Sequence, residues 1–386
     1  MKKRLVSVLM SVTMAASLLA GCGSGAGGSS AVANTGDTAA SDASSQAEAT
    51  VEAEEETAAV DIPLAGACWY NFADTFISNA RQSLLNIAAA DGAIAVEDAD
   101  SQNDTATQTN NMNNMFSKDV DYLILNNINT GAIDDICNQI LEQGSYGIFA
   151  NTDSPSDKNF EKNEKLYSVS SVATQSGDIM GEAIAEYWKA NPDADRNGNG
   201  KLDYIMLLGI QGHYDTTVRS QYSVQKIVDS GIEVNQIGGD LVCEYSRAKA
   251  QEAVAALLAN YSDDIDAIIA CNDDMALGGI EALKAGGFFG EDGKKVLVAG
   301  VDATAVGCDA VREGTLLVTA LNNPITLAKA TYKVMKLTSE GKEVTTESMG
   351  LDGVTVEGRR VWIDYKAITK DNVDEANYDI NDTVIE

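Results

Sequence analysis

The sequence predicts an α/β fold of two doubly wound parallel-sheet lobes. From residue 64 onward, short runs that are almost continuously apolar alternate with amphipathic stretches of helical period. This alternation is typical of parallel strands that helices cover on both faces. The apolar runs are too many for one compact sheet, so we expect two lobes of βα units.

The elements alternate regularly along the chain. The predicted strands are Ala65–Trp69, Ala93–Val96, Tyr122–Leu125, Tyr146–Ala150, Tyr204–Leu208, Ile232–Ile237, Ala267–Cys271, Val296–Val301 and Leu316–Leu321. The helical stretches between them include Phe76–Ala90, Ile133–Gln143, Gly177–Ala190, Ala248–Asn260, Met275–Ala285 and Ile325–Leu337. Ligands of such sheets bind beyond the carboxyl ends of the strands, so a site is expected there.

Residues 1–21 are predicted to be an export signal. Three positive charges precede an apolar run, Leu5–Leu19, which is too short for a stable membrane span. The sequence Leu19-Ala-Gly-Cys22 resembles the bacterial lipobox, which implies cleavage before Cys22 and acylation of its sulfur. The alternative is a plain signal peptide followed by an incidental cysteine. We therefore expect an extracytoplasmic protein that is lipid-anchored to the cell membrane.

Residues 22–60 are predicted to form a flexible acidic linker behind the acylated cysteine, because small and acidic residues dominate them. The chain carries 27 Lys and Arg against 58 Asp and Glu, a net charge of −31. Loss of the three basic residues of the signal would leave 24 against 58, or −34. Such a charge argues against binding nucleic acid or anionic lipid headgroups.

Five cysteines remain besides the predicted lipidation site. They are Cys68, Cys137, Cys243, Cys271 and Cys308. Their odd number and wide spacing do not suit a disulfide framework. Most lie beside apolar runs, so we expect buried free thiols.

Polar and aromatic side chains gather at the carboxyl ends of the predicted strands. They are Tyr70, Asp74 and Phe76 after the first strand, Asn151 after the fourth, His213, Asp215 and Arg219 after the fifth, and Asn272, Asp302 and Asn322 after the last three. Carboxylates, amides and guanidinium groups offer paired donors or acceptors, which suit the vicinal hydroxyls of a sugar. An aromatic ring suits the apolar face of a pyranose.

Together these motifs resemble the periplasmic galactose/glucose-binding proteins, the sugar-binding proteins that serve ABC transporters. The carriers are Tyr70…Asp74-Thr-Phe76, Asp100-Ser-Gln-Asn-Asp104, Gly212-His-x-Asp215-x-x-x-Arg219, Ala270-Cys-Asn272-Asp-Asp-Met-Ala276, Gly300-Val-Asp302-Ala and Leu321-Asn322. Each motif alone is weak, but their order and spacing over residues 66–372 are specific. The resemblance implies the type I periplasmic-binding-protein fold, with a three-strand hinge between the lobes.

The resemblance also implies roles for single residues. Sugar hydroxyls would be bound by Asp74 and Asn151 from one lobe and by His213, Asp215, Arg219, Asn272, Asp302 and Asn322 from the other. Tyr70 belongs to the first motif and is counted with the site. Phe76 and Tyr245 would sandwich the sugar ring, with Tyr245 standing where the family has a tryptophan.

A second difference from the family pattern bears on the expected affinity for the sugar. Thr152 stands where the family carries a lysine, directly after Asn151. The change removes a charge-assisted hydrogen bond worth roughly 1.5–3 kcal/mol, or about ten- to a hundredfold in affinity. Thr152 therefore implies either a lower affinity or a different preferred epimer.

Several of these residues could instead have a structural role. His213, the only histidine, could be a structural donor. Asp215 could N-cap the helix that follows it, and Asp215 and Arg219 could form an ion pair at i,i+4. Asp302 and Asn322 could be turn residues, and Phe76 could belong to the core.

Residues 195–203 match the first nine positions of an EF-hand loop. The ligands would be Asp195, Asn197, Asn199, the carbonyl of Lys201, and Asp203, with Gly200 at the sharp turn. Position 12 is Met206, which does not ligate a hard cation. The resemblance implies that the last carboxylate comes from Asp266, where the family has a glutamate. We expect a structural calcium ion, and the alternative is a polar loop without one.

The predicted N-terminal lobe comprises residues 61–170 and 323–353, and the C-terminal lobe residues 171–322 and 354–386. The hinge is expected near residues 170–171, 322–323 and 353–355.

The resemblance implies a monomeric solute-binding lipoprotein that closes over a glucose- or galactose-like monosaccharide and delivers it to an ABC transporter permease. An alternative is a sensing module that presents the closed state to a chemoreceptor or a sensor kinase. A glycosidase with Asp74 and Asp215 as its carboxylate pair is a third possibility. Because every candidate group suits ground-state hydrogen bonding, we expect no enzyme.

Overall fold

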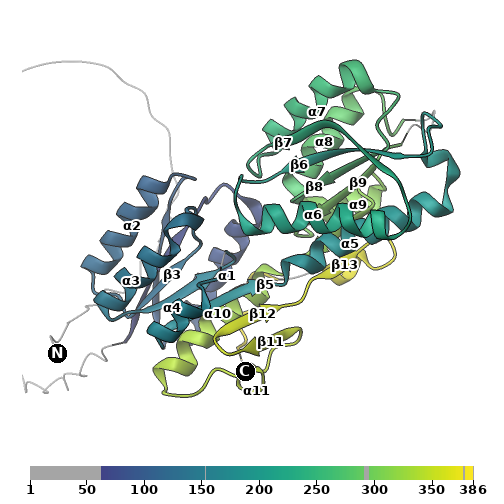
Figure 1. The fold of residues 1–386 in the computed structure, drawn as a ribbon. Helices are drawn as coiled ribbons and strands as arrows, with labels where there is room; N and C mark the ends of the chain where they lie inside the picture. The colour runs from purple at the N-terminus through teal and green to yellow at the C-terminus, as the bar shows by residue number, and fades with distance from the viewer. Residues whose placement is uncertain (1–61, 153, 291–294, 377–378, 386) are drawn as a thin grey trace, which may run out of the picture. The chain divides into compact units, whose positions relative to one another are not determined.

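The computed structural model describes residues 62–152, 154–290, 295–376 and 379–385 (Figure 1). The predicted signal peptide, Cys22 and the linker lie outside these residues. Residues Ile62–Glu386 form one compact unit by their contacts. Within the described part, no helix is long and apolar enough to cross a membrane.

The first sheet has seven strands in the order β11-β12-β5-β4-β3-β1-β2. Its strands are β1 (Leu64–Trp69), β2 (Ala95–Asp100), β3 (Tyr122–Leu125), β4 (Tyr146–Ala150), β5 (Leu166–Ser171), β11 (Val354–Glu357) and β12 (Arg360–Ile363). The helices around it are α1 (Thr75–Asp91), α2 (Thr105–Ser117), α3 (Ile133–Gln143), α4 (Asp157–Lys162), α10 (Pro324–Ser339) and α11 (Thr346–Met349), with the 3-10 turn η1 (Thr130–Ala132). All neighbouring strands are parallel except the β11–β12 hairpin.

The second sheet has six strands in the order β13-β10-β9-β8-β6-β7. Its strands are β6 (Leu202–Leu208), β7 (Val234–Val242), β8 (Ala267–Ala270), β9 (Leu297–Val301), β10 (Val318–Leu321) and β13 (Lys366–Ile368). The helices are α5 (Ala173–Ala190), α6 (Tyr214–Asp229), α7 (Arg247–Tyr261), α8 (Asp273–Ala285) and α9 (Ala305–Glu313), with η2 (Pro192–Ala194) and η3 (Val373–Ala376). Only β13 is antiparallel to its neighbour among these strands. The predicted pair of doubly wound lobes is confirmed.

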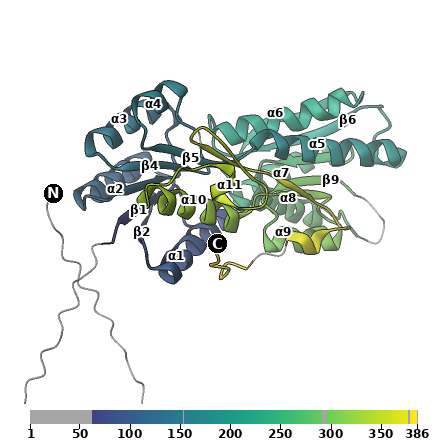
Figure 2. The ribbon, with the colours of Figure 1, turned by 90° about the horizontal axis from the view of Figure 1, so that it is seen from below.

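The central strands β3, β8, β9 and β10 are almost entirely apolar, because helices bury both faces of each sheet there. In β3, Tyr122 and Ile124 pack in the cluster that contains α1 and α10, whereas Leu123 and Leu125 pack with α2 and α3. The second sheet is covered by α7, α8 and α9 on one face and by α5 and α6 on the other. Figure 2 shows these layers, with α3 and α4 on the side of the first sheet opposite α1.

Three connections join the two sheets. The chain crosses after Ser171, at Asn322–Asn323, and at Asp364–Tyr365 between β12 and β13. The predicted crossing near 353–355 is wrong, and so is the assignment of residues 354–363 to the C-terminal lobe, whereas β13 and η3 belong to that lobe as predicted. The hairpin β11–β12 instead extends the first sheet through β5, and Val361 and Ile363 bury their side chains in the core of that lobe.

The strands β5, β11, β12 and β13 are not among the predicted strands, and in β5 and α2 polar residues hide the element. β5 has the sequence Leu-Tyr-Ser-Val-Ser-Ser, yet its serines Ser168, Ser170 and Ser171 are buried. α2 is rich in Asn and Thr and buries only one narrow stripe. The five cysteines are buried free thiols, as predicted.

Candidate functional site

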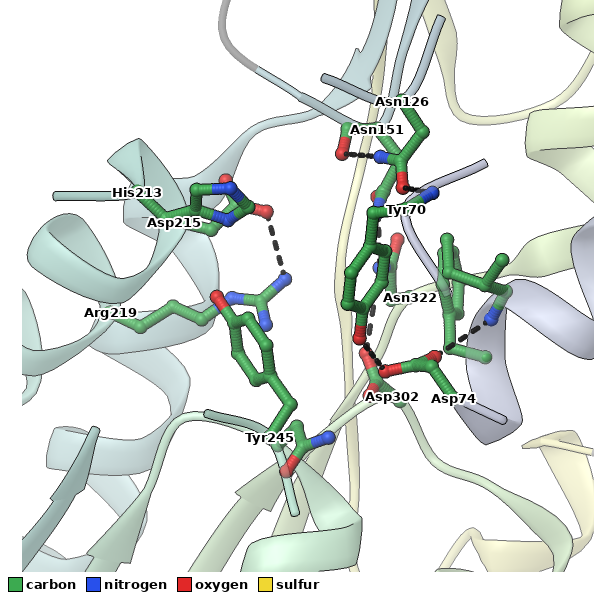
Figure 3. Close-up of a pocket in the computed structure, with 13 residues that line it drawn as sticks. Tyr70, Asp74, Asn126, Asn151, His213, Asp215, Arg219, Tyr245, Asp302 and Asn322 are labelled. Atoms are coloured by element: carbon green, nitrogen blue, oxygen red, sulfur yellow. Dashed lines mark hydrogen bonds and ion pairs between the residues drawn. The ribbon is translucent and has the colours of Figure 1, made fainter. Parts of the chain in front are cut away.

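A pocket lies between the carboxyl ends of the two sheets (Figure 3). Its lining consists of Tyr70, Asp74, Phe76, Ile77, Asn126, Asn151, His213, Asp215, Arg219, Tyr245, Asn272, Asp302 and Asn322. All eleven residues that the sequence marked for a sugar are in this set, together with Ile77 and Asn126.

Asp74 is fixed by the start of α1. One carboxylate oxygen accepts the backbone N–H of Ile77 at 2.8 Å, which caps the helix, and the other accepts the hydroxyl of Tyr70 at 2.5 Å. Burial raises the pKa of Asp74, and the bonds from Tyr70 and Ile77 oppose that rise. The motif spacing of Tyr70 and Asp74 therefore serves to join these two side chains.

Asn126 ties two strand ends together. Its Oδ1 accepts the backbone N–H of Tyr70 at 3.3 Å, and its Nδ2 donates to the carbonyls of Ala150 and Asn151 at 3.1 and 2.7 Å. Asn151 has a φ of 50°, an uncommon backbone state that this bond helps to hold. The sequence analysis missed Asn126, although it directly follows β3 and so obeys the same strand-end rule.

The start of α6 presents three polar residues to the pocket. His213 is the N-cap residue of the helix but makes no side-chain cap bond, and Asp215 lies in the first turn. The suggestion that Asp215 caps the helix is therefore wrong. The suggested ion pair is present, with Asp215 Oδ2 at 3.2 Å from Arg219 Nη2.

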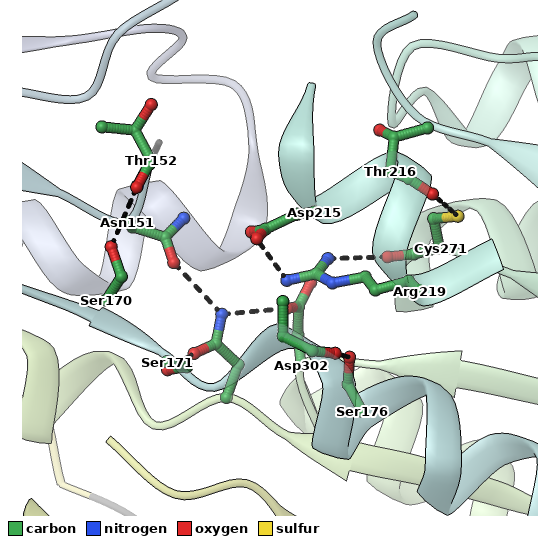
Figure 4. Close-up of polar contacts among 12 residues, drawn as sticks. Asn151, Thr152, Ser170, Ser171, Ser176, Asp215, Thr216, Arg219, Cys271 and Asp302 are labelled. Atoms are coloured by element: carbon green, nitrogen blue, oxygen red, sulfur yellow. Dashed lines mark hydrogen bonds and ion pairs between the residues drawn. The ribbon is translucent and has the colours of Figure 1, made fainter. Parts of the chain in front are cut away.

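Arg219 is the one Arg or Lys among the described residues that line the pocket, and it is 4% exposed. Its Nη1 donates to the carbonyl of Cys271 at 2.8 Å, and its Nη2 donates to the hydroxyl of Tyr365 at 2.8 Å. Figure 4 shows the guanidinium held between Asp215 and Cys271. The cation is thus fixed in place by the protein alone.

Two buried polar atoms of this pocket have no hydrogen-bond partner among the described residues. They are His213 Nε2 and Arg219 Nε. Burial lowers the pKa of His213, while the charge of Asp215 and the nearby backbone groups of Ile128 and Asn127 oppose that effect. The imidazole is therefore neutral near pH 7, and Nε2 donates or accepts according to its tautomer.

Asn322 joins the hinge to both lobes. Its Nδ2 lies 3.4 Å from Asn151 Oδ1 and 3.5 Å from Asp302 Oδ1, and its Oδ1 accepts the hydroxyl of Ser171 at 2.7 Å. Asn322 is therefore more than a turn residue, because its side chain contacts both lobes. The residue that caps α10 is Asn323.

Asp302 and Asn272 complete the polar lining. Asp302 has a φ of 111°, and burial raises the pKa of its carboxyl although Arg219 opposes the rise. Backbone strain of this kind persists only where the surrounding structure enforces it, and it is frequent at functional sites. Asn272 caps α8 through its Oδ1, which accepts from Met275 N at 3.0 Å.

Tyr245 packs directly on the backbone that follows β6. A Cβ at Gly209 would lie 2.2 Å from the Tyr245 ring, and the Tyr245 hydroxyl is 2.8 Å from Thr216 Oγ1. The ring meets that of Tyr70 edge to face, with centroids 6.4 Å apart. Phe76 lines the pocket and also belongs to the core of the first lobe, and its stacking on a sugar ring stays a prediction.

The loop of residues 195–203 lies apart from this pocket lining. The oxygens of Asp195 accept the backbone N–H groups of Gly198, Asn199 and Gly200 at 2.8 to 3.1 Å. Asp203 Oδ2 accepts the side-chain amides of Asn197 and Asn199 at 2.9 and 2.6 Å.

Asp266 fastens this loop to the lobe. Its two oxygens accept the backbone N–H groups of Arg196 and Asp203, each at 2.9 Å, and burial raises its pKa to about 6. The side chain of Lys201 pairs with Glu233 outside the loop. Within the described ranges, no three His, Cys, Asp or Glu side chains are grouped as metal ligands.

The comparison with known proteins agrees with this architecture. Residues 66–343 match the periplasmic binding protein domain. The D-galactose/methyl-galactoside binding periplasmic protein MglB of Haemophilus influenzae is 32% identical over 309 residues, covering 80% of this chain and 90% of that protein.

Solved structures of sugar-binding proteins share the fold. An ABC transporter solute-binding protein from Bacillus halodurans with bound myo-inositol has a TM-score of 0.63 at 26% identity, covering 81% of this chain and 96% of that one. A solute-binding protein from Clostridium phytofermentans with bound β-D-glucose has a TM-score of 0.66 at 19% identity, covering 81% and 95%. The chain therefore belongs to the periplasmic binding protein family, whose members are extracytoplasmic sugar-binding components of ABC transporters and not enzymes.

Proposed function

We propose that this protein captures a glucose- or galactose-like monosaccharide between its lobes and delivers it to an ABC transporter permease. The observation that carries the proposal is the pair of buried atoms without partners in the described structure, His213 Nε2 and Arg219 Nε. Buried polar atoms of this kind cost free energy unless a ligand bonds to them. A sugar hydroxyl both donates and accepts, so it satisfies either atom.

The remaining lining supplies the complementary acceptors. The carboxylates of Asp74, Asp215 and Asp302 accept from hydroxyls, and they come from both lobes. The amide of Asn151 offers a donor and an acceptor to a neighbouring hydroxyl. This mixture favours a neutral polyhydroxylated ring over an anionic ligand, because three carboxylates face one guanidinium.

Two rings are available to stack on the apolar faces of the sugar. Phe76 comes from the first lobe and Tyr245 from the second, and both line the pocket. The phenol of Tyr245 covers less of the sugar than an indole would, so its contribution to affinity is smaller.

Thr152 gives the sugar no substitute for the family's lysine. Its hydroxyl donates to the carbonyl of Asn127 at 3.2 Å, and its backbone N–H donates to Ser170. Thr152 is not among the residues that line the pocket. We therefore expect an affinity about ten- to a hundredfold below that of a lysine-bearing site.

Closure of the lobes over the sugar is supported by contacts that cross the cleft. Thr75 Oγ1 on α1 donates to Asp274 Oδ2 on α8 at 2.9 Å, and Tyr70 meets Tyr245. A sugar that touches both lobes binds the closed state better and so increases its population. The permease would recognise this closed state, and a chemoreceptor or sensor kinase would recognise the same surface.

A structural calcium ion in the loop of residues 195–203 is part of the proposal. Asp195, Asp203, two asparagine oxygens, the Lys201 carbonyl and Asp266 supply the hard oxygen ligands that calcium prefers. In the described structure the amide nitrogens of Asn197 and Asn199 face Asp203, so both amides would turn over to ligate. The donor set fits calcium with this one rearrangement.

The anchor and the oligomeric state rest on the sequence. We propose that Cys22 is acylated, that residues 23–60 tether the lobes to the membrane, and that the protein acts as a monomer. Mass spectrometry of the protein from the membrane fraction tests the anchor, since a diacylglyceryl group on Cys22 adds a defined mass.

Calorimetric titration of residues 23–386 with glucose, galactose, xylose and ribose tests the sugar assignment. Micromolar or tighter binding of glucose or galactose is expected. Absence of binding by every hexose would contradict it. Stimulation of the cognate permease's ATPase by the sugar-loaded protein separates delivery from sensing.

A further inference from the structure

Tyr365, on the third crossing between the lobes, contacts the guanidinium of Arg219 in the pocket. Tyr365 lies between β12, which pairs in the first sheet, and β13, which pairs in the second. Its ring is 8% exposed and packs in the core of the second lobe. Its hydroxyl accepts from Arg219 Nη2 at 2.8 Å, although 146 residues separate the two.

The other partners of the guanidinium differ in kind from this one. Cys271 and Asp215 both belong to the second lobe, close to Arg219 itself. Tyr365 alone among these three partners is on a connection between the sheets. It is also outside the pocket lining, so its effect on a ligand must pass through Arg219.

The backbone of Tyr365 is fixed at the first crossing. Its N–H donates to Gln175 Oε1 at 2.8 Å, and Gln175 Nε2 donates to Asp364 Oδ1 at 2.9 Å. Gln175 lies in the first turn of α5, directly after the chain leaves β5. The backbone at Tyr365 is thus tied to the start of α5, and its hydroxyl contacts Arg219.

We propose that Tyr365 is a positioning residue that orients the Arg219 guanidinium so that Nε faces the ligand. The proposal rests on the proposed function, since it names the determinant of one sugar contact. Hydrogen bonds to an ionised donor are short and directional, so the Tyr365 hydroxyl, which is the nearer of the two acceptors at Nη2, adds to the restraint that Asp215 and Cys271 place on rotation of the planar group. Without it, the guanidinium keeps its acceptors at Cys271 and Asp215 but turns more freely.

The test is Tyr365→Phe in the chain of residues 23–386, with Tyr122→Phe as the matched control. Tyr122 is likewise buried, and its hydroxyl donates to the carbonyl of Met335 in the first lobe, away from the pocket. Tyr365→Phe is expected to weaken sugar binding by about ten- to thirtyfold, and Tyr122→Phe by less than about twofold. Equal affinities of Tyr365→Phe and the wild type would overturn the proposal.

A deoxy-sugar series separates positioning from a general structural effect. In the wild type, removal of the hydroxyl that contacts Arg219 costs affinity, and in Tyr365→Phe that one cost is expected to shrink about threefold or more. Costs for the other hydroxyls should not change. A uniform loss across all deoxy sugars would show a structural role only and would contradict the proposal.

A measurement without sugar makes the outcome independent of the sugar assignment. Nitrogen-15 NMR reports rotation of the Arg219 guanidinium about its Cζ–Nε bond, and Tyr365→Phe should speed that rotation about fivefold or more. If the wild type binds no sugar but the rotation changes, the proposed ligand fails and the positioning role stands. Unchanged rotation refutes the positioning role whether or not sugar binds. Gln175→Ala, which keeps the hydroxyl, should give a smaller change and serves if Tyr365→Phe does not fold.

Discussion

The pocket between the lobes and the loop of residues 195–203 are both polar, yet they use their polar groups in opposite ways. In the loop, carboxylate oxygens of Asp195, Asp203 and Asp266 accept from the loop's own N–H and amide groups. In the pocket, Nε2 of His213 and Nε of Arg219 are buried and unpaired within the described structure. The polar groups of the loop are hydrogen-bonded to one another, whereas the pocket keeps two buried polar atoms available to a ligand.

The two sites differ in how far their side chains are already arranged before a ligand binds. The loop is at the surface and able to turn two amides over when a cation arrives. The pocket is buried, so a partner missing there costs more than one missing at the surface. On the proposed function, fixed side chains would select the sugar, and the loop would rearrange to bind calcium.

The largest predicted effect is loss of sugar binding on Arg219→Lys. Lysine keeps the charge but lacks the planar fork that reaches Cys271, Tyr365 and the ligand together. Affinity should fall at least about a hundredfold, or about 2.7 kcal/mol. Arg196→Lys is the matched control, because Arg196 lies in the loop and donates to the carbonyls of Ser262 and Ile265. Calorimetry giving the two variants the same affinity would remove the distinction between pocket and loop.

Calcium should stabilise the protein without changing its affinity for sugar. At a calcium concentration about 100 times the dissociation constant, the gain is about 2.7 kcal/mol, which raises Tm by roughly 4 °C for a folded part of this size. Asp195→Asn should abolish this shift and leave the affinity for sugar unchanged. Scanning calorimetry with calcium and with a chelator measures it, and identical Tm values in both would contradict the calcium site.

Restoring the family's lysine at position 152 should raise the affinity for the sugar. Thr152→Lys is expected to tighten glucose or galactose binding about tenfold, since it adds a charge-assisted bond worth about 1.4 kcal/mol. Thr152→Val, which removes only the hydroxyl bonded to Asn127, should change affinity by less than about threefold. Titration calorimetry on both variants shows whether affinity is limited by the missing charge or by a changed shape of the pocket. If the shape has changed, the lysine variant would bind no more tightly than the wild type.

The smallest predicted effect concerns the bond across the cleft. Thr75→Val removes the donor to Asp274 and should weaken sugar binding about threefold, because only the closed state loses a hydrogen bond of about 0.7 kcal/mol. Thr109→Val is a control of the same kind, since that hydroxyl bonds within α2. An unchanged affinity in Thr75→Val would mean that this bond does not favour closure.

The site was easier to predict than parts of the fold. Asn272 and Asp302 follow strands closely, and Asp215 lies in the first turn of a helix, so strand order and periodicity locate them. Asn126 follows the same rule and was missed because its partners are backbone groups. The crossing at Asp364–Tyr365 was missed because only tertiary pairing of β12 with β5 assigns that hairpin to the first lobe.

The central claim is that the unpaired atoms of the pocket receive a sugar. His213 is the only histidine of the chain, so its nitrogen-15 resonances are assigned without ambiguity. Titration of the protein with glucose or galactose should shift the Nε2 resonance to a hydrogen-bonded value and saturate with the calorimetric affinity. An Nε2 resonance that stays unchanged at saturating sugar would contradict the account.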